Sequence, residues 1–551
     1  MLNCMNYTFS KSKYLPSGLR RRGVQNLKKS SRYNDSISDN PYTSVECIQL
    51  STLNISDASE LLMLVPRFCC LRVRTQLAAL TLALFLAWTL LRWRTAYVPA
   101  NLFGHISDLT ASHQKFWRDF HTLLEQCSPN TTAPVIENER APTEGFKLKD
   151  APPRPNYLHI PDDDVATLKD AHTQFVDTIS QSPPQLSYIP DTKGVVTTAG
   201  GFYLPVLVIS LRMLRWTGST LPMEVFLADE DEYEEYICDQ VLPSLNARCL
   251  VLSRILSVAP VNIEKYQYKP FAMLFSSFEE ILFLDADAFP LEKPEVLFWA
   301  EPFLSRKMVT WPDFWGSSAS PLFYKITGQV APPMELRQST ESGELLISKK
   351  THTRTLLLCT YYNYWGPSHY YPLLSQGAAG EGDKETFLAA ASVMQEHFYQ
   401  VSERICALGH GTDGGMAGSA MAQFNPIQDF SLTSQGKWRV RGDEAQAPSV
   451  FFIHANFPKF NPATVFDDGA VNPAFADDGS YTRAWTIPES VVKDFSSKAD
   501  VEKIFWQEIL WTACELEDKF STWRDHVDIC AAVKDYWGAV FGDERLREER
   551  T

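Results

Sequence analysis

The stretch GVVTTAGGFYLPVLVISLRMLRWTGSTLPMEVFLA, residues 194–228, decides the fold class. It predicts four consecutive features: a strand over Val195–Thr198, a turn at Gly200 and Gly201, a helix ending near Trp216, and a strand over Met223–Ala228. A strand, turn, helix and strand in so short a length form a βαβ unit.

Two further apolar runs extend this pattern. RCLVLS (248–253) and ILFLD (281–285) supply the next two strands, so we predict an α/β fold with a doubly wound, nucleotide-binding sheet. The glycine turn reads TAGG and not G-x-G-x-x-G, which disfavours a dinucleotide-binding enzyme. The two glycines make either a tight turn or backbone contact with a nucleotide.

The strand within EEILFLDADAFP (279–290) ends on two aspartates. Side chains at i and i+2 of an extended chain point to the same side, so Asp285 and Asp287 can converge at the strand's end. Two such carboxylates repel each other unless a cation lies between them. Ligands of open α/β sheets bind beyond the carboxyl ends of the strands. The motif predicts a cation site, and a solvated acidic turn is the alternative.

Composition excludes other classes of protein. The chain has 551 residues, is 45% hydrophobic and carries a net charge of −15, so it can bury a large core. Residues 1–94 hold 13 basic and 5 acidic residues, a net of +8, which leaves −23 for residues 95–551. Because phosphate binding needs a basic face, this acidic body argues against nucleic acid as a partner.

One segment predicts a membrane helix. TQLAALTLALFLAWTLL, residues 75–91, has no charge and is flanked by arginines on both sides. We expect a single transmembrane helix, short enough for the thinner membranes of the early secretory pathway; a buried core helix is the alternative. The basic motifs LRRRG and LKK upstream favour a cytosolic N-terminus and a luminal body.

This topology divides the chain into five expected parts. They are a disordered cytosolic tail (1–74), a signal anchor (75–91), a luminal stem (92–190), a catalytic domain (191–480) and a helical C-terminal extension (481–551). The sequon at Asn130 would be usable in the lumen. Seven of the eleven cysteines lie there, and Cys238 with Cys249, or Cys514 with Cys530, are near enough to pair. No C-x-x-C occurs, which disfavours zinc.

Several long blocks in the body resemble a known family. They are LPMEVFL, YKPFAMLFSSFEEILFLDADAFPLEKPEVLF, WPDFWGSSASPLFY, ESGELLISKKTH, GEGDKETF and FFIHANFPKFNP. Together, over about residues 192–462, they resemble the fungal Golgi α-1,3-mannosyltransferases. These are type II membrane enzymes with a GT-A fold that take mannose from GDP-mannose. The resemblance therefore implies a Golgi membrane protein with a luminal catalytic domain and association with other Golgi transferases.

The resemblance also implies a metal site for the diphosphate. Asp287 would bind Mn²⁺ or Mg²⁺, Asp285 would contact the ribose and the metal, and His454 would be the third ligand, with Lys459 on the diphosphate. Carboxylates suit these hard cations, and a metal that bridges phosphate oxygens stabilises the leaving group. For His454 the alternative is a packed core histidine. The turn at Thr198, Gly200 and Gly201 would also touch the donor.

Further residues would hold the donor sugar. Lys269 would reach a phosphate or sugar, or is an exposed lysine. Glu341, Ser342 and Gly343 would form a turn that cradles the sugar before a strand, or an ordinary turn. Asp383 would be the carboxylate beneath the anomeric carbon, or the N-cap of the helix in KETFLAAASVMQ.

The reaction expected is α-retaining transfer of mannose from GDP-mannose to a mannose-containing glycan. It proceeds either through a covalent glycosyl-enzyme or on one face, with the departing phosphate taking the acceptor's proton. Trp311, Trp315 and Tyr371 would form an aromatic wall for the acceptor, or belong to the core. A UDP-sugar donor and a non-catalytic glycan-binding subunit are the alternative functions.

Overall fold

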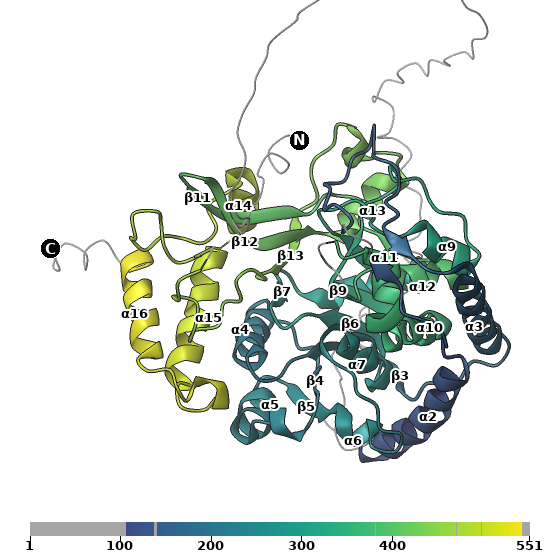
Figure 1. Ribbon diagram of the computed structural model, residues 1–551. Helices are drawn as coiled ribbons and strands as arrows, with labels where there is room; N and C mark the ends of the chain where they lie inside the picture. The colour runs from purple at the N-terminus through teal and green to yellow at the C-terminus, as the bar shows by residue number, and fades with distance from the viewer. Residues whose placement is uncertain are drawn as a thin grey trace, which may run out of the picture. The chain divides into compact units, whose positions relative to one another are not determined.

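A mixed sheet of seven strands, in the order β10-β8-β9-β6-β3-β4-β5, forms the centre of the structure (Figure 1). The computed structural model describes residues 106–136, 140–378, 380, 382–469, 471–497 and 499–542, all within one unit. The strand bounds are β3 Ile189–Thr198, β4 Met223–Leu227, β5 Ala247–Val251, β6 Phe278–Leu284, β8 Met308–Pro312, β9 Thr340–Ser348 and β10 Tyr399–Gln400.

The predicted βαβ unit is confirmed. β3 and β4 are parallel and are joined by helix α4 (Tyr203–Trp216), and β3 also lies parallel to β6. The chain runs from β3 through α4 to β4 in one direction across the sheet and from β5 back past β3 to β6 in the other, and right-handed crossovers in opposite directions put their helices on opposite faces. Accordingly α4 lies on one face and α7 (Tyr268–Phe275), which precedes β6, lies on the other with α10 (Thr353–Tyr364). β9 runs antiparallel to both β6 and β8, so the sheet is mixed.

A second, four-stranded antiparallel sheet, in the order β11-β12-β13-β7, stands above the carboxyl edge of the first. Its strands are β7 Ala288–Pro290, β11 Cys406–Thr412, β12 Gly415–Phe424 and β13 Val450–His454. β7 follows directly on β6, so the chain passes from one sheet to the other at Asp285 and Asp287. Both sheets contribute to one apolar core, to which β6 gives Leu282 and Leu284, and every residue of β6 is buried.

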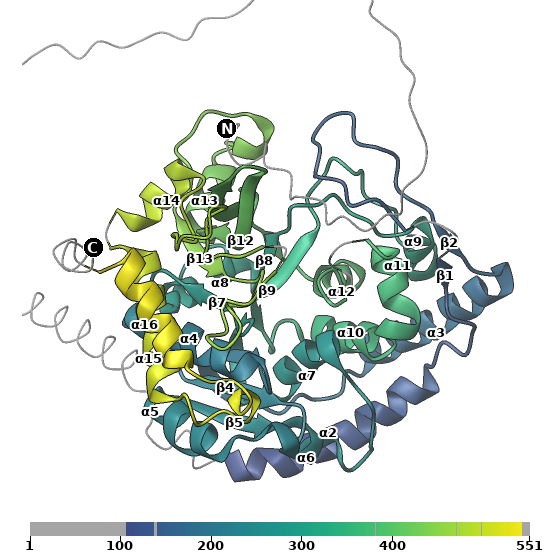
Figure 2. The ribbon, with the colours of Figure 1, turned by 60° about the vertical axis from the view of Figure 1, so that its left-hand side comes forward.

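The segment expected to be a stem forms two long helices from Ile106 onward: α2 (Ile106–Gln126) and α3 (Asp162–Gln181). Both pack on the body (Figure 2). Trp117 of α2 is fully buried and donates from Nε1 to Ala259 O at 2.8 Å, and Phe175 of α3 stacks on Tyr361 of α10 with ring centroids 4.3 Å apart. A two-residue pair, β1 (Val135–Ile136) with β2 (Leu158–His159), lies between them in the chain.

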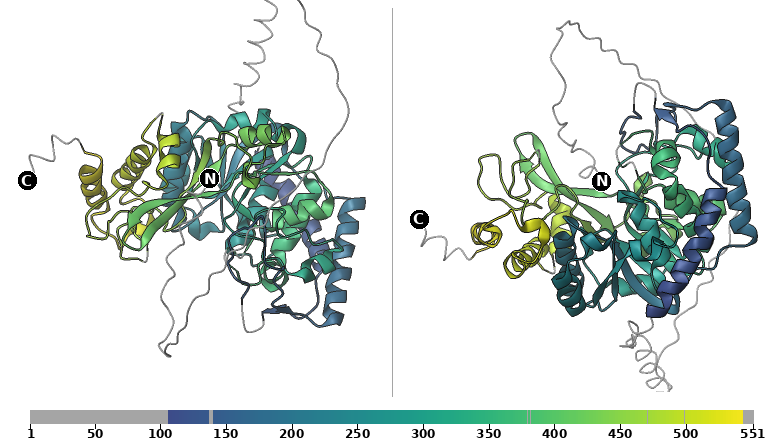
Figure 3. Two further views of the ribbon diagram at one scale, coloured as in Figure 1. Left: turned by 90° about the horizontal axis from the view of Figure 1, so that it is seen from above. Right: turned by 60° about the horizontal axis from the view of Figure 1, so that its bottom comes forward.

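The C-terminal extension is helical, with α14 (Glu489–Ser496), α15 (Val501–Glu515) and α16 (Ile529–Val540). Seen from above, α15 and α16 flank the sheets on the side away from α2 and α3 (Figure 3). Arg212 of α4 forms an ion pair with Glu508 and lies 3.6 Å from the ring centroid of Trp511, so α15 is fixed to α4.

The remaining helices are short or complete the faces of the sheets. Their bounds are α5 Leu242–Ser244, α6 Leu252–Leu256, α8 Phe303–Arg306, α9 Pro321–Thr327, α11 Tyr371–Ser375, α12 Thr386–Met394 and α13 Pro426–Ser434.

Both predicted cysteine pairs are present as disulfides, Cys238–Cys249 and Cys514–Cys530. Cys127, Cys359 and Cys406 are buried and form no disulfide among the described residues. The predicted tail and anchor, residues 1–91, lie outside the described residues. Among the residues that are described, no helix has both the length and the apolar character needed to cross a membrane.

Candidate functional site

Asp285 and Asp287 occupy the turn that joins the two sheets. Backbone hydrogen bonds hold this turn, from Asp285 N to Gly343 O at 2.8 Å and from Ala288 N to Asp285 O at 3.0 Å. The side chain of Asp285 is 22% exposed, whereas that of Asp287 is 3% exposed. The two carboxylates therefore differ in access to ligands: Asp285 faces a cavity and Asp287 faces the protein.

His454 is the residue on which both carboxylates converge. Its Nε2 lies 3.1 Å from Asp287 Oδ1 and 3.9 Å from Asp285 Oδ2. It ends β13, and its pairing with Ala288 of β7 puts it beside the aspartate turn. The predicted grouping of these three residues therefore holds in the structure.

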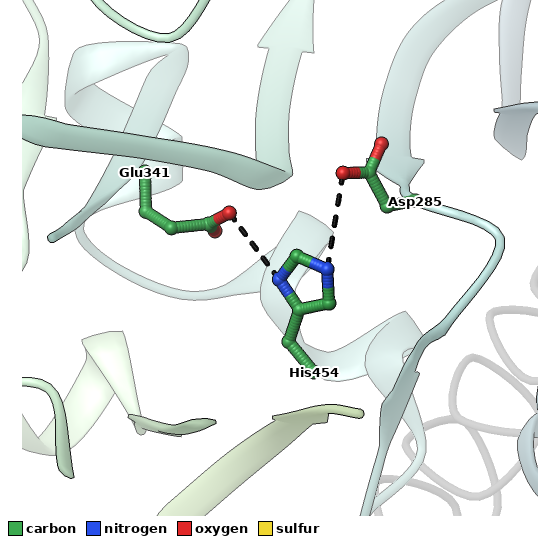
Figure 4. Close-up of side chains that lie close together, drawn as sticks. All are labelled: Asp285, Glu341 and His454. Carbon is green, nitrogen blue, oxygen red and sulfur yellow. Dashed lines mark ion pairs between the residues drawn. The ribbon is translucent and has the colours of Figure 1, made fainter. Parts of the chain in front are cut away.

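Glu341 completes the group from the other side of the imidazole. Its Oε1 lies 3.3 Å from His454 Nδ1, so the ring stands between Glu341 and Asp285 (Figure 4). Ligand atoms of Asp285, Glu341 and His454 all lie within 4.8 Å of one another. The ring approaches β9 so closely that a Cβ on Gly343 would lie 2.6 Å from His454 Cε1, which explains the glycine there.

Two lysines neutralise the aspartates. Lys269 Nζ donates to Asp285 Oδ2 at 2.9 Å, and to Ser342 O and Oγ at 3.1 and 3.0 Å. Lys459, in the loop after β13, forms an ion pair with Asp287. Burial alone would raise the pKa of Asp287, but His454 and Lys459 hold it well below its usual range. Asp287 is therefore ionised at neutral pH.

The neighbouring titratable groups show how much negative charge is concentrated here. Burial would lower the pKa of His454, but Asp287 and Glu341 raise it well above its usual value. Burial and the adjacent Glu341 raise the pKa of Glu344 far above its usual range, while His454 brings that of Glu341 down to about 2 against its burial. The cluster thus attracts protons, as it would attract a metal cation.

A divalent cation fits this donor set. Two carboxylates and an imidazole suit Mn²⁺ or Mg²⁺, and Glu341 Oε2 is buried without a hydrogen-bond partner among the described residues. The set that the geometry favours is Asp285, Glu341 and His454. Asp287, predicted as a ligand, lies on the Nε2 side of His454 together with Asp285, 3.1 Å from that nitrogen, whereas Glu341 lies on the Nδ1 side.

A cavity of about 740 Å³ opens beside this cluster. We call it the central cavity. It is lined by Tyr266, Lys269, Asp285, Asp313, Phe314, Trp315, Glu341, Ser342, Gly380, Asp383, Lys384, Gly418, Ser419, Ala420, Met421, Asn456 and Phe457.

Asp383 lies in the wall of the central cavity, linked to the cluster through Lys269. Its Oδ2 is 3.7 Å from Lys269 Nζ and is buried without a hydrogen-bond partner among the described residues. Burial raises the pKa of Asp383 to about 6, against the opposing effect of Lys269. The helix-capping alternative is wrong, because α12 begins at Thr386 and the residue at its N-cap is Glu385. Asp383 thus presents a buried carboxylate oxygen in the lining of the central cavity.

The predicted donor turn lies at the same sheet edge but outside the central cavity. Thr198 ends β3, level with Asp285 in the parallel pairing with β6. Gly201 has φ of 48°, a left-handed conformation that favours glycine, and a Cβ on Gly200 would overlap the carboxylate of Glu232. The turn is connected to the loop of Lys459, because Asn461 Nδ2 donates to Phe202 O at 3.0 Å.

Two details differ from the sequence interpretation. Glu341, Ser342 and Gly343 lie within β9 and not in a turn before it, because antiparallel pairing with β8 extends to Thr340, the first residue of this strand. Trp311 is fully buried, donates from Nε1 to Phe424 O at 3.0 Å and packs on Phe452, so it belongs to the core and to no acceptor wall. Trp315 does line the central cavity.

Sequence reasoning missed the ion pair between Asp313 and Lys384 in the cavity wall. Lys384 Nζ donates to Asp313 Oδ2 at 2.6 Å, and burial raises the pKa of Asp313 although Lys384 opposes this. Asp313 directly follows β8. The rule that singled out Asp285, a polar residue at the end of a buried strand, would have found it too.

The sequence was compared with known proteins. Residues 192–338 and 333–425 match the model of a family described as "Mannosyltransferase putative". The α-1,2-mannosyltransferase MNN21 of Candida albicans is 36% identical over 370 residues, 56% of this chain and 56% of its own length. MNN24 of the same organism, also an α-1,2-mannosyltransferase, is 32% identical over 460 residues, 69% of this chain and 64% of its own. The chain thus spans just over half to about two thirds of these relatives.

Among solved structures, a galactosyltransferase LgtC in complex with donor and acceptor sugar analogues shares 12% identity over 38% of this chain and 73% of its own, with a TM-score of 0.26. A likeness of that size supports no conclusion about this chain. Both relatives above are α-1,2 enzymes by name, so the α-1,3 linkage implied by the resemblance is not supported. Over residues 192–425 the sequence matches the mannosyltransferase family.

Proposed function

We propose that this protein is a glycosyltransferase that moves mannose from GDP-mannose to a mannose-containing glycan, with retention of the α configuration. The proposal rests mainly on one observation: Lys269 contacts two groups of side chains at once, through Asp285 and through Asp383. On one side is a carboxylate and imidazole cluster suited to a divalent metal, and on the other is Asp383 in a cavity large enough for sugars. Because the relatives are named α-1,2-mannosyltransferases, we propose an α-1,2 linkage in place of α-1,3.

In this reaction Asp285, Glu341 and His454 would hold Mn²⁺ or Mg²⁺, with Asp287 orienting His454. A metal held by these residues would neutralise charge on the departing diphosphate. Lys459 adds a positive charge on the diphosphate side, and Thr198, Gly200 and Gly201 form the edge that the nucleotide approaches. Lys269 has three partners in the cluster, Asp285, Ser342 and Asp383, so it fixes the carboxylates relative to each other.

Asp383 would stabilise the positive charge that develops at the anomeric carbon. The bond from that carbon to the diphosphate breaks and a bond to the acceptor oxygen forms on the same face, while the acceptor's proton passes to the departing phosphate. Double displacement with Asp383 as nucleophile is the alternative. Fixed charges in a buried site cost little reorganisation when the transition state forms, which is the main source of rate here.

We further propose that residues 75–91 anchor the protein in the Golgi membrane with the body in the lumen. The two disulfides support this, because disulfides persist in the secretory pathway and are rare in the cytosol. Protection of the body from protease in sealed microsomes tests the topology. Digestion of the body while the vesicles are intact would exclude it.

The function is tested with full-length protein purified in detergent. GDP-mannose, UDP-galactose and UDP-glucose are each supplied with Mn²⁺ or with chelator, and the linkage of any product on an α-mannoside is determined. We expect transfer from GDP-mannose with Mn²⁺ and an α-1,2 product. Transfer from a UDP-sugar alone would replace the donor assignment, and no donor hydrolysis or transfer across a broad acceptor panel would favour a non-catalytic glycan-binding subunit.

A further inference from the structure

A second cavity adjoins the central cavity. It measures about 580 Å³ and shares two lining residues, Tyr266 and Gly380, with its neighbour. We call it the outer cavity. The two spaces are contiguous at Tyr266, so a chain molecule that ends in the central cavity has a path into the outer one. The outer cavity is lined by Arg140, Glu264, Lys265, Tyr266, Pro367, Tyr371, Gly377, Ala378 and Gly380.

Tyr266 stands close to the residues proposed to act on the donor sugar. It lies three positions before Lys269, and its ring packs against the loop of Asp383: a Cβ on Gly382 would lie 2.6 Å from Tyr266 Cδ2. The residue is 49% exposed, so about half of its surface remains available for a ligand. An exposed aromatic ring at the junction of two cavities is a surface on which a sugar ring can stack.

Hydrogen bonds fix the turn that carries Tyr266. Glu264 and Gln267 form a reciprocal capping box, and Gln267 Nε2 donates to Asn363 O at 2.8 Å. Asn363, on α10, also accepts from Tyr371 OH at 2.6 Å, so two walls of the outer cavity share one buried residue.

The same network reaches the Asp383 loop. Asn363 Nδ2 donates to Thr386 Oγ1 at 2.8 Å, and Thr386 Oγ1 donates to Asp383 O at 2.6 Å. The outer cavity is therefore built on the framework that positions Asp383. A ligand bound in the outer cavity would be held in a defined place relative to that carboxylate.

The lining fits an uncharged, hydroxyl-rich ligand. Tyr266 and Tyr371 offer aromatic surface, and Arg140, Lys265 and Glu264 offer donors and acceptors without a dominant charge. The volume is within the range of about 300–1,000 Å³ typical of small-ligand pockets. Lys459, Gly200 and Gly201, proposed for the diphosphate and nucleotide, line neither cavity, and the proposed metal ligands Asp285 and Glu341 line only the central one. These features favour the sugar side of the reaction over the nucleotide side.

We propose that the outer cavity binds the sugar residues that precede the accepting sugar of an oligosaccharide, with Tyr266 as the contact between the two cavities. This proposal rests on the proposed function and names its acceptor class: an α-mannoside of several residues and not free mannose. An acceptor that fills both cavities gains contacts that a monosaccharide cannot make, so chain length should appear in KM for the acceptor.

The test compares acceptors of increasing length. Full-length protein with saturating GDP-mannose and Mn²⁺ is given methyl α-mannoside and α-linked oligomers of two to five mannoses, and kcat and KM are measured for each. In the unchanged protein we expect KM to fall by about tenfold or more between one and four sugars, since one aromatic stacking contact is worth up to about that factor. A KM independent of length would overturn the proposal.

Three variants locate the effect. Tyr266→Ala and Arg140→Ala should raise KM for the tetrasaccharide relative to methyl α-mannoside, and Tyr266→Phe should keep the length dependence because it keeps the ring. The control is Tyr157→Ala, which alters an aromatic residue lining a separate cavity and should leave the ratio of the two KM values unchanged. An unchanged ratio in both Tyr266→Ala and Arg140→Ala would refute the assignment.

Two binding measurements separate this proposal from the proposed function. Calorimetric binding of mannotetraose to protein with GDP and Mn²⁺ should be lost in Tyr266→Ala; this result would support the outer cavity even if no transfer from GDP-mannose were found. Failure of mannotetraose to bind the unchanged protein would overturn the proposal whatever the enzyme's activity. If Tyr266→Ala instead weakened Mn²⁺-dependent GDP binding to the same extent with every acceptor, the outer cavity would be reassigned to the nucleotide.

Discussion

Substitution of Glu341 by glutamine tests which residues bind the metal. The change keeps the shape of the side chain but removes its negative charge. It also keeps a side-chain oxygen that can accept the hydrogen bond from Gly343 N, which is 2.8 Å from Glu341 Oε1 in the unchanged protein. At the 3.3 Å between Glu341 Oε1 and His454 Nδ1, and an effective dielectric constant of about 20, the charge interaction is about 5 kcal/mol before desolvation. A divalent cation in the same place would feel the loss more strongly than the imidazolium does.

We expect Glu341→Gln to weaken Mn²⁺ binding by at least about 100-fold, because losing even a residue that orients a ligand costs about 10–100-fold. Transfer should fall by on the order of 10² or more. Titration of free Mn²⁺ by electron paramagnetic resonance measures the affinity without any turnover. The fold should persist, since glutamine keeps the size of the side chain and the oxygen that accepts from Gly343 N.

Asp287→Asn is the matched comparison, because Asp287 contacts His454 and Lys459 and stands outside the favoured ligand set. Its Mn²⁺ affinity should fall less, within the range of about 10–100-fold expected for an orienting carboxylate. Should Asp287→Asn abolish Mn²⁺ binding while Glu341→Gln leaves it intact, the ligand set predicted from sequence would replace the one favoured by the geometry.

Lys269→Met should destabilise the metal-free protein by about 3–5 kcal/mol in urea unfolding, because it leaves Asp285 and Asp383 without their shared cation; an unfolding midpoint equal to that of the unchanged protein would contradict this. Asp383→Asn should abolish transfer and retain Mn²⁺-dependent GDP binding. In the unchanged protein, kcat should fall as the pH drops below about 6, where Asp383 takes up a proton. A kcat that stays constant down to pH 5 would exclude a role for ionised Asp383. Burial raises the pKa of Glu502 from 4.5 to about 8, so the folded state binds this proton more tightly and the free energy of unfolding should decrease from pH 4.5 to 8. Glu502→Gln should flatten that slope, and an identical slope would count against it. Trp523→Phe removes the hydrogen bond from Trp523 Nε1 to Asn461 Oδ1, at 3.0 Å, and should lower the free energy of unfolding by about 1–3 kcal/mol. It should also raise KM for GDP-mannose, because Asn461 also donates to Phe202 O. An unaltered KM would show that the C-terminal extension does not affect binding of GDP-mannose.

The sequence predicted the central βαβ unit closely because local patterns determine it. The helix ends at Trp216 as expected, and the second strand is one residue shorter than its predicted range. The helices α2 and α3 were harder to place. Their apolar spacing indicates helices, but the surfaces that bury Trp117 and Phe175 come from residues more than a hundred positions away, and nothing local reveals them.

The site was predictable in part, and mainly through the resemblance. Asp285 and Asp287 could be chosen from their position at a strand end. The meeting of Lys269 with Ser342 and Asp383 spans more than a hundred positions, so spacing could not predict it. Glu341 belongs to the cluster because its side chain lies on one particular face of β9. The pairing of β9 with β6 and β8 determines which face that is.

The position of His454 shows how the register of one small strand pair creates the cluster. Asp287 and His454 are 167 positions apart, and they meet because β7 pairs with β13 so that Ala288 lies opposite His454. Successive side chains of a strand point to opposite faces, so a slip of one residue would turn the imidazole away and present Ile453 or Ala455 to the aspartates. The same pairing continues into the loop that carries Lys459 to Asp287. The abrupt passage from β6 into β7, which the apolar run ending in Asp-Ala-Asp and the proline at 290 indicate, therefore brings His454 and Lys459 to the carboxyl edge of the seven-stranded sheet.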